Sequence, residues 1–152
     1  MKKSLLFLQL IFVLILSQAA IAQQKIKPTL NHVALYVVDI KASANFYSNI
    51  IQLDTIPEPF HDGKHTWYSI GPLSHLHVIQ GAAAATPHDK NVHLCFTVPS
   101  VKDFITVLDA NHIEYENLVG QKQAVTNRVD GVKQIYFKDP DGYWLEINDA
   151  RR

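Results

Sequence analysis

The sequence feature that most constrains the fold is an internal duplication. The segment NHVALYVV at residues 31–38 recurs 61 residues later as VHLCFTV at residues 92–98, and this shift places His32 on His93. Both copies alternate between apolar and other residues, which is the two-residue period of a β-strand with one packed face. Each strand therefore carries one histidine opposite its packed face. One imidazole from each copy on a common inner face predicts a metal or catalytic centre shared between two halves of the chain.

The duplication predicts two modules, each with the order strand, helix and three strands. A helix over roughly 41–51 follows Asp39, which can cap it, and a helix over roughly 101–111 follows Ser100, where the pattern Ser-x-x-Asp resembles a capping box. The remaining strands are expected over roughly 54–60, 64–70 and 75–80 in the first module and 114–119, 132–138 and 143–148 in the second. The helix faces expected to pack on the sheets contain Ala42, Phe46 and Ile50 in one helix and Val101, Phe104, Ile105 and Leu108 in the other.

The later strands repeat at a different offset. At an offset of 69 residues, Trp67 falls on Tyr136 and His77 falls on Glu146. The second module therefore has about eight extra residues, which we place in the loop 120–130 as a lid, a substrate loop or an inert insertion. The segment GAAAATPHDK at residues 81–90 is expected to link the modules.

Residues 1–22 have the pattern of a secretory signal peptide. Lys2 and Lys3 precede an apolar run, and Ala20-Ile21-Ala22 forms a small-residue cleavage site before Gln23. The run is short for a membrane span, although an uncleaved anchor is the alternative. We therefore expect an exported protein, periplasmic or secreted, with no membrane attachment after cleavage. A polar lead-in at 23–29 precedes one domain at 30–149, with modules at about 30–80 and 91–149.

Charge and cysteine content exclude several function classes. Loss of Lys2 and Lys3 leaves 12 basic and 14 acidic residues, and no basic cluster indicates a nucleic-acid surface. Cys95 is the single cysteine, so an internal disulfide is impossible. It shares the strand face of His93, where we interpret it as a small packed residue rather than a metal ligand or nucleophile.

Four candidate metal ligands emerge when the alternation is applied to the last strand of each module. His77 and Glu146 both lie opposite apolar neighbours, as His32 and His93 do, so the four side chains meet in one concavity if the sheets curl. Three imidazoles and one carboxylate suit one divalent ion, such as zinc, nickel, cobalt, iron(II) or manganese. His75 shares this face and is a candidate to replace or support His77. The other histidines are expected at the surface; these are His61, His65, His88 and His112.

The run Asp139-Pro140-Asp141-Gly142-Tyr143-Trp144-Leu145-Glu146, together with the two histidine strands, resembles the vicinal oxygen chelate superfamily. This superfamily includes glyoxalase I, fosfomycin-resistance proteins, extradiol dioxygenases and bleomycin-binding proteins. The resemblance implies an α+β fold in which two βαβββ modules form a curved mixed sheet around a metal site, often completed by a homodimer. It implies that His32, His93 and Glu146 are shared metal ligands. His77 stands where bacterial glyoxalase I has a glutamate, which weakens assignment to that enzyme.

The leading functional hypothesis is a metal-dependent lyase or isomerase of the glyoxalase type that acts on a small oxygen-chelating substrate. In this hypothesis the ion stabilises an enediolate while Glu146 or His77 moves a proton. A glutathione adduct is not the expected substrate of an exported protein. The sequence leaves open the substrate, the metal, and whether one site is built from one chain or from two.

Three alternatives use other residues. Two histidines and a glutamate also form the iron(II) triad of a ring-cleaving dioxygenase. A fosfomycin-type enzyme would use Lys122 and Arg128 to contact a phosphonate. A bleomycin-type binding protein would use an aromatic cleft lined by Tyr36, Trp67 and Trp144, although aromatic residues in strands are more often core or dimer contacts.

Overall fold

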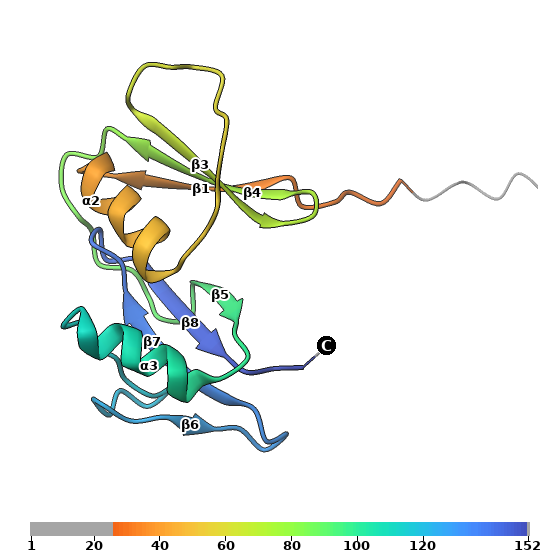
Figure 1. Cartoon of the computed structure of the whole chain (residues 1–152), viewed down its shortest axis with the longest axis vertical. Helices are drawn as coiled ribbons and strands as arrows, with labels where there is room; N and C mark the ends of the chain where they lie inside the picture. Colours follow the sequence, from red (N-terminus) through yellow and green to blue (C-terminus); the bar gives the residue numbers. More distant parts are fainter. Residues whose placement is uncertain (1–25, 152) are drawn as a thin grey trace, which may run out of the picture.

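Two mixed β-sheets of four strands, each accompanied by one helical segment, make up the computed structural model, which describes residues 26–151 (Figure 1). The predicted signal peptide at 1–22 and its cleavage site lie outside the described residues. No helix between residues 26 and 151 is long and apolar enough to cross a membrane.

The modules follow the predicted order of elements. The first contains β1 (His32–Val37), α2 (Ile40–Asn45), the π-helix η1 (Phe46–Ile50), β2 (Thr55–Ile56), β3 (His65–Gly71) and β4 (Ser74–Gln80). The second contains β5 (His93–Thr97), α3 (Val101–Ala110), β6 (Thr126–Asn127), β7 (Lys133–Lys138) and β8 (Trp144–Asn148). The strand orders are β1-β4-β3-β2 and β5-β8-β7-β6, which makes β1 and β5 edge strands.

The two sheets pair their strands in the same register. In the parallel pair β1 and β4, Ala34 lies opposite His77, and in the parallel pair β5 and β8, Cys95 lies opposite Glu146. Ala34 lies two residues after His32 in β1, and Cys95 lies two residues after His93 in β5. His77 and Glu146 are therefore structurally equivalent, as the repeat predicts.

One hydrophobic core serves both modules. Phe137 of β7 packs against Phe46 of the first module, with ring centroids 6.2 Å apart, and against Phe104 of α3, at 6.0 Å. The apolar residues of β1 and β4, such as Leu35 and Leu76, are buried in this core. As predicted, the packed faces are covered by helices and the histidine faces point away from them.

Helix starts agree with the predicted caps. The Asp39 carboxylate accepts hydrogen bonds from the backbone N–H groups of Lys41 and Ala42, and the Ser100 hydroxyl accepts one from Asp103. The first helix differs from the prediction in its second half, which is the π-helix η1. Ala42 is exposed and Ser43 is buried in its place, because the buried stripe includes an inter-module contact.

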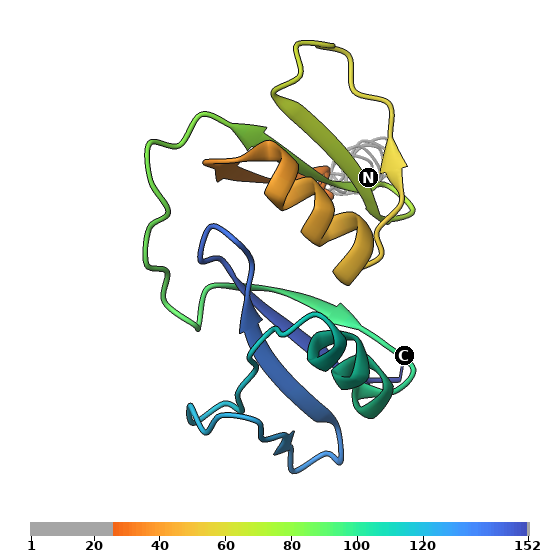
Figure 2. The same cartoon turned by 60° about the vertical axis from the view of Figure 1, so that its left-hand side comes forward.

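The turn between β7 and β8 joins the modules. The Tyr47 hydroxyl donates to Asp139 Oδ2 at 2.8 Å, and the Ser43 hydroxyl donates to Asp141 Oδ2 at 2.9 Å. The backbone N–H of Val38 donates to Asp141 Oδ1 at 2.7 Å. Helix α2 consequently lies between the first sheet and the second module (Figure 1, Figure 2).

The outer strands were predicted wrongly. The expected strand at 114–119 forms only isolated bridges at Glu116, because Asn117 turns the chain by accepting hydrogen bonds from Gly120 and Gln121. The short strand β6 instead lies within the predicted extra loop. In the first module, β2 ends at Ile56, before two prolines that have no N–H to donate to a sheet.

Candidate metal centre

His93 and Glu146 form the better-ordered pair of predicted ligands. They lie on the neighbouring strands β5 and β8, with His93 Nε2 3.3 Å from Glu146 Oε2 and only 8% of the Glu146 side chain exposed. His93 Nδ1 lies 2.7 Å from the backbone carbonyl of Lys90, which can only accept, so Nδ1 carries the proton. The Nε2 of a neutral ring is then an electron-pair donor beside a carboxylate oxygen. Two ligands at about 2.1 Å from one zinc-type ion are separated by roughly this distance.

Neighbouring donors keep the Glu146 carboxylate ionised. Tyr136 donates its hydroxyl to Oε2 at 2.6 Å, while Asn148 and Cys95 donate to Oε1 at 2.8 Å and 3.4 Å. Burial favours the neutral acid, but these hydrogen bonds outweigh it and hold the pKa of Glu146 below its ordinary value. The carboxylate is therefore in the form that binds a cation and accepts a proton.

His32 and His77 form the second pair, on β1 and β4. Their rings are stacked, with centroids 4.2 Å apart and planes 7° apart, and Trp67 stacks on the other side of His77 at 3.9 Å. Burial, followed by the nearby His32, His75 and His65 rings, lowers the pKa of His77, so its ring is neutral near pH 7. Its Nε2 is buried and has no hydrogen-bond partner among the described residues. A metal ion is one group that would satisfy this atom.

The two pairs do not meet within one chain. Across residues 26–151, no three His, Cys, Asp or Glu side chains lie close enough together to hold a metal ion. The segment from β1 through η1 contacts the β7–β8 turn, and the apolar faces of the two sheets, not their histidine faces, line the shared core. Each pair nevertheless includes a residue of an edge strand, β1 or β5, which has a neighbouring strand on one side only.

The predicted substrate-binding residues are dispersed. Tyr36 is 55% exposed near the end of β1, where the Tyr143 hydroxyl contacts its backbone. Trp67 lies beside His77, and Trp144 donates its indole N–H to the carbonyl of His88 at 2.9 Å. The loop cations are already paired: Arg128 contacts Asp130 at 2.6 Å, and Lys122 contacts Glu114 at 2.7 Å.

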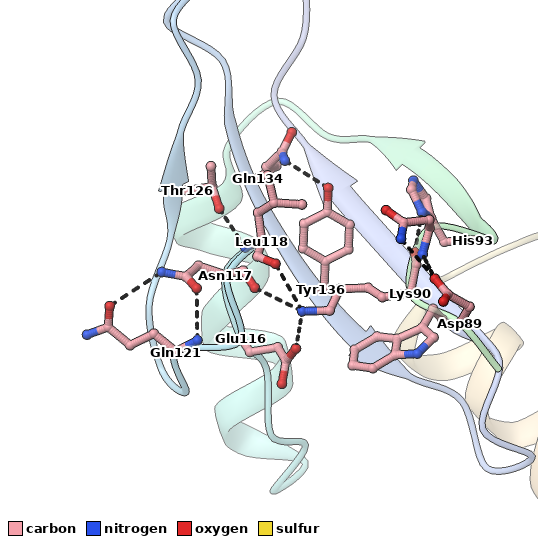
Figure 3. A network of polar contacts seen from close by, with 12 residues as sticks. Asp89, Lys90, His93, Glu116, Asn117, Leu118, Gln121, Thr126, Gln134 and Tyr136 are labelled. Carbon is pink, nitrogen blue, oxygen red and sulfur yellow. Dashed lines mark hydrogen bonds and ion pairs between the residues drawn. The ribbon is translucent and has the colours of Figure 1, made fainter. Parts of the chain in front are cut away.

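Lys90 organises the outer face of the second sheet (Figure 3). Its ammonium group pairs with the Glu116 carboxylate and donates to the carbonyls of Asn117 and Leu118, at 3.3 Å and 3.2 Å. It also lies over the ring of Tyr136 at 5.7 Å. A cavity of about 290 Å³ adjoins this face, and its lining includes Glu116, Lys122, Tyr136, Lys138 and Trp144. The last linker residue therefore shapes the surface beside Glu146 and orients His93.

A comparison with protein families decides the affiliation of this duplicated fold. The family model described as the Glyoxalase/Bleomycin resistance protein/Dioxygenase superfamily matches residues 29–147. The chain belongs to this superfamily.

Individual relatives of the superfamily are distant. A lactoylglutathione lyase from Pseudomonas putida is 26% identical, with 77% of this chain and 82% of the relative covered. A glyoxalase/dioxygenase structure from Nostoc punctiforme has a TM-score of 0.67 at 23% identity, covering 86% of this chain and 99% of that one. The fosfomycin resistance protein FosX from Listeria monocytogenes has a TM-score of 0.66 at 22% identity, covering 83% and 96%. The structural likeness establishes the superfamily fold.

Sequence reasoning missed several residues around this superfamily site. Tyr136 and Asn148 share the Glu146 face, and the alternation rule applied along β7 and β8 would have identified both. No sequence signal indicated that the Lys90 carbonyl holds His93. The expectation that His65 lies at the surface was wrong, because its side chain is only 17% exposed at the start of β3.

Proposed function

We propose that this protein is an exported metal-dependent enzyme of the glyoxalase type, a lyase or isomerase acting on a small substrate with neighbouring oxygen atoms. The observation that carries the proposal is the His93–Glu146 pair, in which an imidazole nitrogen and an ionised carboxylate face each other at 3.3 Å. Membership of the superfamily and the lactoylglutathione lyase relative support the reaction class.

We further propose that the complete site forms in a homodimer. His32 and His77 of one chain would join His93 and Glu146 of a second chain around one divalent ion. Each half lies on a sheet whose edge strand, β1 or β5, has an unpaired side, and such edges favour association with another chain. Juxtaposition of β1 with β5 of the second chain would bring the two halves of the site together.

The residues divide the chemistry between them. A bound divalent ion would supply Lewis-acid polarisation of substrate oxygens. Glu146, kept ionised by its hydrogen bonds, is one candidate general base. His77, kept neutral by burial, is the second, and its Nε2 is able to accept a proton only in a site where it does not bind the metal.

Metal content tests the ligand assignment. The purified full chain is expected to contain about one zinc-type ion per chain, and His93→Ala and Glu146→Ala are expected to lose it. His112→Ala, which removes an exposed histidine outside both pairs, is the matched control and should retain it. A folded parent without metal after loading with each candidate ion would refute the proposal. Release of a chain that begins at Gln23 into the periplasm or medium would support export.

A mixing experiment tests the shared site. The variants His32→Ala/His77→Ala and His93→Ala/Glu146→Ala should each lack metal as homodimers. A heterodimer of the two variants retains both intact halves in one of its two shared sites, so it should bind one ion. If each site is built within a single chain, the same heterodimer would bind none.

The stacking of His77 favours a second candidate function. Because the planes of His32 and His77 are only 7° apart, both rings cannot direct a nitrogen at one ion without opening the stack. If His77 stays stacked, His32, His93 and Glu146 remain, which is the iron(II) triad of ring-cleaving oxygenases. Retention of iron and of oxygen-dependent catechol cleavage in His77→Ala would favour this alternative. Loss of metal from His77→Ala would favour four-ligand binding.

A further inference from the structure

The cavity on the outer face of the second sheet contains a lysine without an ionic partner. Lys138 ends β7, and its ammonium group lies 4.6 Å from the centre of the Trp144 ring. Both residues line the cavity of about 290 Å³. The ammonium group of Lys138 makes no ion pair or hydrogen bond with residues 26–151. The indole ring therefore holds a positive charge at the cavity without neutralising it.

The two carboxylates that line the same cavity already have cationic partners. Glu116 pairs with Lys90 (Figure 3), and Glu114 pairs with Lys122 at 2.7 Å. Once these pairs are formed, the charge of Lys138 is the one that remains among the described residues of the cavity. The cavity is therefore suited to a ligand group with a single negative charge. A phosphate ester would bring a second negative charge toward Glu114 and Glu116 without a further free cation to bind it.

This cavity lies beside the proposed metal ligand Glu146. The ring of Tyr136 lines the cavity, while its hydroxyl group donates to Glu146 at 2.6 Å. In the pairing of β7 with β8, Tyr136 lies opposite Glu146, and Lys138 lies opposite Trp144. Two residues along a strand span about 7 Å. A short molecule that binds the ion with one end is therefore able to reach Lys138 with the other.

Hydrogen bonds hold the walls of the cavity in place. Glu116 and Tyr136 exchange two backbone hydrogen bonds, each 2.8 Å long. Trp144 donates its indole N–H to the carbonyl of His88 at 2.9 Å, which fixes the ring beneath Lys138. A ligand that enters a cavity with fixed walls loses less free energy to the ordering of side chains.

We propose that the substrate carries a carboxylate on a short arm, and that Lys138 binds this carboxylate in the cavity. This inference rests on the proposed function, because the ion would hold the opposite end of the same molecule. Lys138 is then a specificity-determining residue, and Trp144 is the residue that positions its ammonium group.

Two chelators that differ only at the end of the arm test the proposal. Glutaric acid monohydroxamate binds metal ions through its hydroxamate and ends in a carboxylate, whereas pentanohydroxamate has the same five-carbon chain and ends in a methyl group. The metal-loaded full chain should bind the first about three- to fivefold more tightly, which is the upper part of the range for an exposed ion pair. Calorimetric titration measures both affinities, and the preference should shrink as the salt concentration rises.

Substitutions of two lysines separate charge recognition from packing. Lys138→Met keeps an unbranched side chain over Trp144 but removes the charge, so it should lose the preference and retain the metal content and unfolding midpoint of the parent. Lys138→Arg keeps the charge and should retain the preference. Lys133→Met is the matched control, because it removes an exposed lysine at the other end of the same strand, and it should also retain the preference. If Lys138 only packed on Trp144, Lys138→Met would leave the preference unchanged.

The inference is overturned if the metal-loaded parent shows no preference, if Lys138→Met keeps it, or if Lys133→Met loses it equally. Absence of metal from the parent is a different result, which contradicts the proposed function. Pentanoate is then added to the metal-free chain, and the indole N–H resonance of Trp144 reports on the cavity. The chain has two tryptophans, so Trp144→Phe identifies this resonance. A shift in the parent but not in Lys138→Met would support the carboxylate site, and an unmoved resonance in the parent would refute it.

Discussion

At the scale of single residues, Glu146 is held in place by several hydrogen bonds. It faces His93, and donors from three strands surround its two oxygens. The hydrogen bond from Tyr136 affects both partners. It lowers the pKa of Glu146, while burial and the neighbouring carboxylate raise the pKa of Tyr136 well above its ordinary value. Tyr136 thus stays protonated and positions Glu146 over the whole physiological pH range.

Removal of this donor should weaken metal binding more than it weakens the fold. Tyr136→Phe leaves Glu146 Oε2 without its shortest hydrogen bond, and loss of such a supporting contact typically lowers metal affinity about 10–100-fold. The unfolding free energy should fall by about 1–2 kcal/mol. Competitive metal titration and urea unfolding measure the two effects. Tyr115→Phe is the control, because Tyr115 is a largely buried tyrosine whose hydroxyl makes no hydrogen bond with the described residues. An equal loss of affinity in that variant would contradict the assignment.

The sheet face on which a side chain lies was predictable wherever strand alternation applied. His32, His77, His93 and Glu146 all lie on the faces that the two-residue period predicts. Contacts made through the backbone could not be predicted in this way, because any residue at position 90 would offer the same carbonyl to His93. The stacking of His77 between two rings depends on side-chain angles, which a sequence pattern does not contain.

At the scale of elements, the β7–β8 turn determines how the modules are joined. Asp139 accepts from Tyr47 and from two backbone N–H groups of its own turn, those of Asp141 and Tyr143. Burial raises the pKa of Asp139 above its ordinary value in spite of these bonds. The sequence predicted a turn here, but it did not indicate that the turn carboxylates accept hydrogen bonds from the first module. Such contacts depend on how segments far apart in the sequence pack together.

The raised pKa of Asp139 predicts a pH-dependent effect of Asp139→Asn. A carboxyl group whose folded pKa is raised contributes its full stabilisation below the unfolded pKa of 3.8 and loses it as the pH rises through the folded value. The neutral amide avoids this loss. The unfolding free energy of the variant, relative to the parent, should therefore be more favourable at about pH 7 than at about pH 4. Urea titrations at both values measure it, and a pH-independent difference would contradict the raised pKa.

Gly142 of the same turn lies close to the backbone of the linker. Its φ of +89° is left-handed, and a Cβ there would lie 3.0 Å from the Thr86 carbonyl oxygen. Gly131 has nearly the same φ, +85°, with open space around it. Both alanine variants should lose about 1–2 kcal/mol from backbone strain, but Gly142→Ala should lose about 1–3 kcal/mol more from the clash. Thermal unfolding measures this difference, and equal losses would show that the linker moves aside freely.

At the scale of the whole molecule, the duplication predicted the two modules but not how they are arranged around the site. The repeat predicted two modules with equivalent sheets, and the structure confirms them. It could not predict the arrangement of the modules, because the same strands suit either closure of one chain on itself or pairing with a second chain. The contacts of the first helical segment with the β7–β8 turn are the observations that decide how the two modules of one chain sit against each other, and they are the basis on which we propose pairing with a second chain.

A shared site makes metal binding and dimerisation reciprocal. If the ion binds only where two chains meet, it stabilises the dimer, and the dimer in turn binds the ion more tightly. At a metal concentration 100 times the dissociation constant, each site should add about 2.7 kcal/mol to the dimer. Sedimentation of the dilute protein should therefore show a dimer with metal and a shift toward monomer after chelation. His93→Ala/Glu146→Ala controls for effects of the chelator elsewhere, since its association should not depend on metal. A parent dimer equally stable with and without bound metal would show that the ion does not bridge the chains, and the site would then have to close within one chain by release of the Tyr47 and Ser43 contacts.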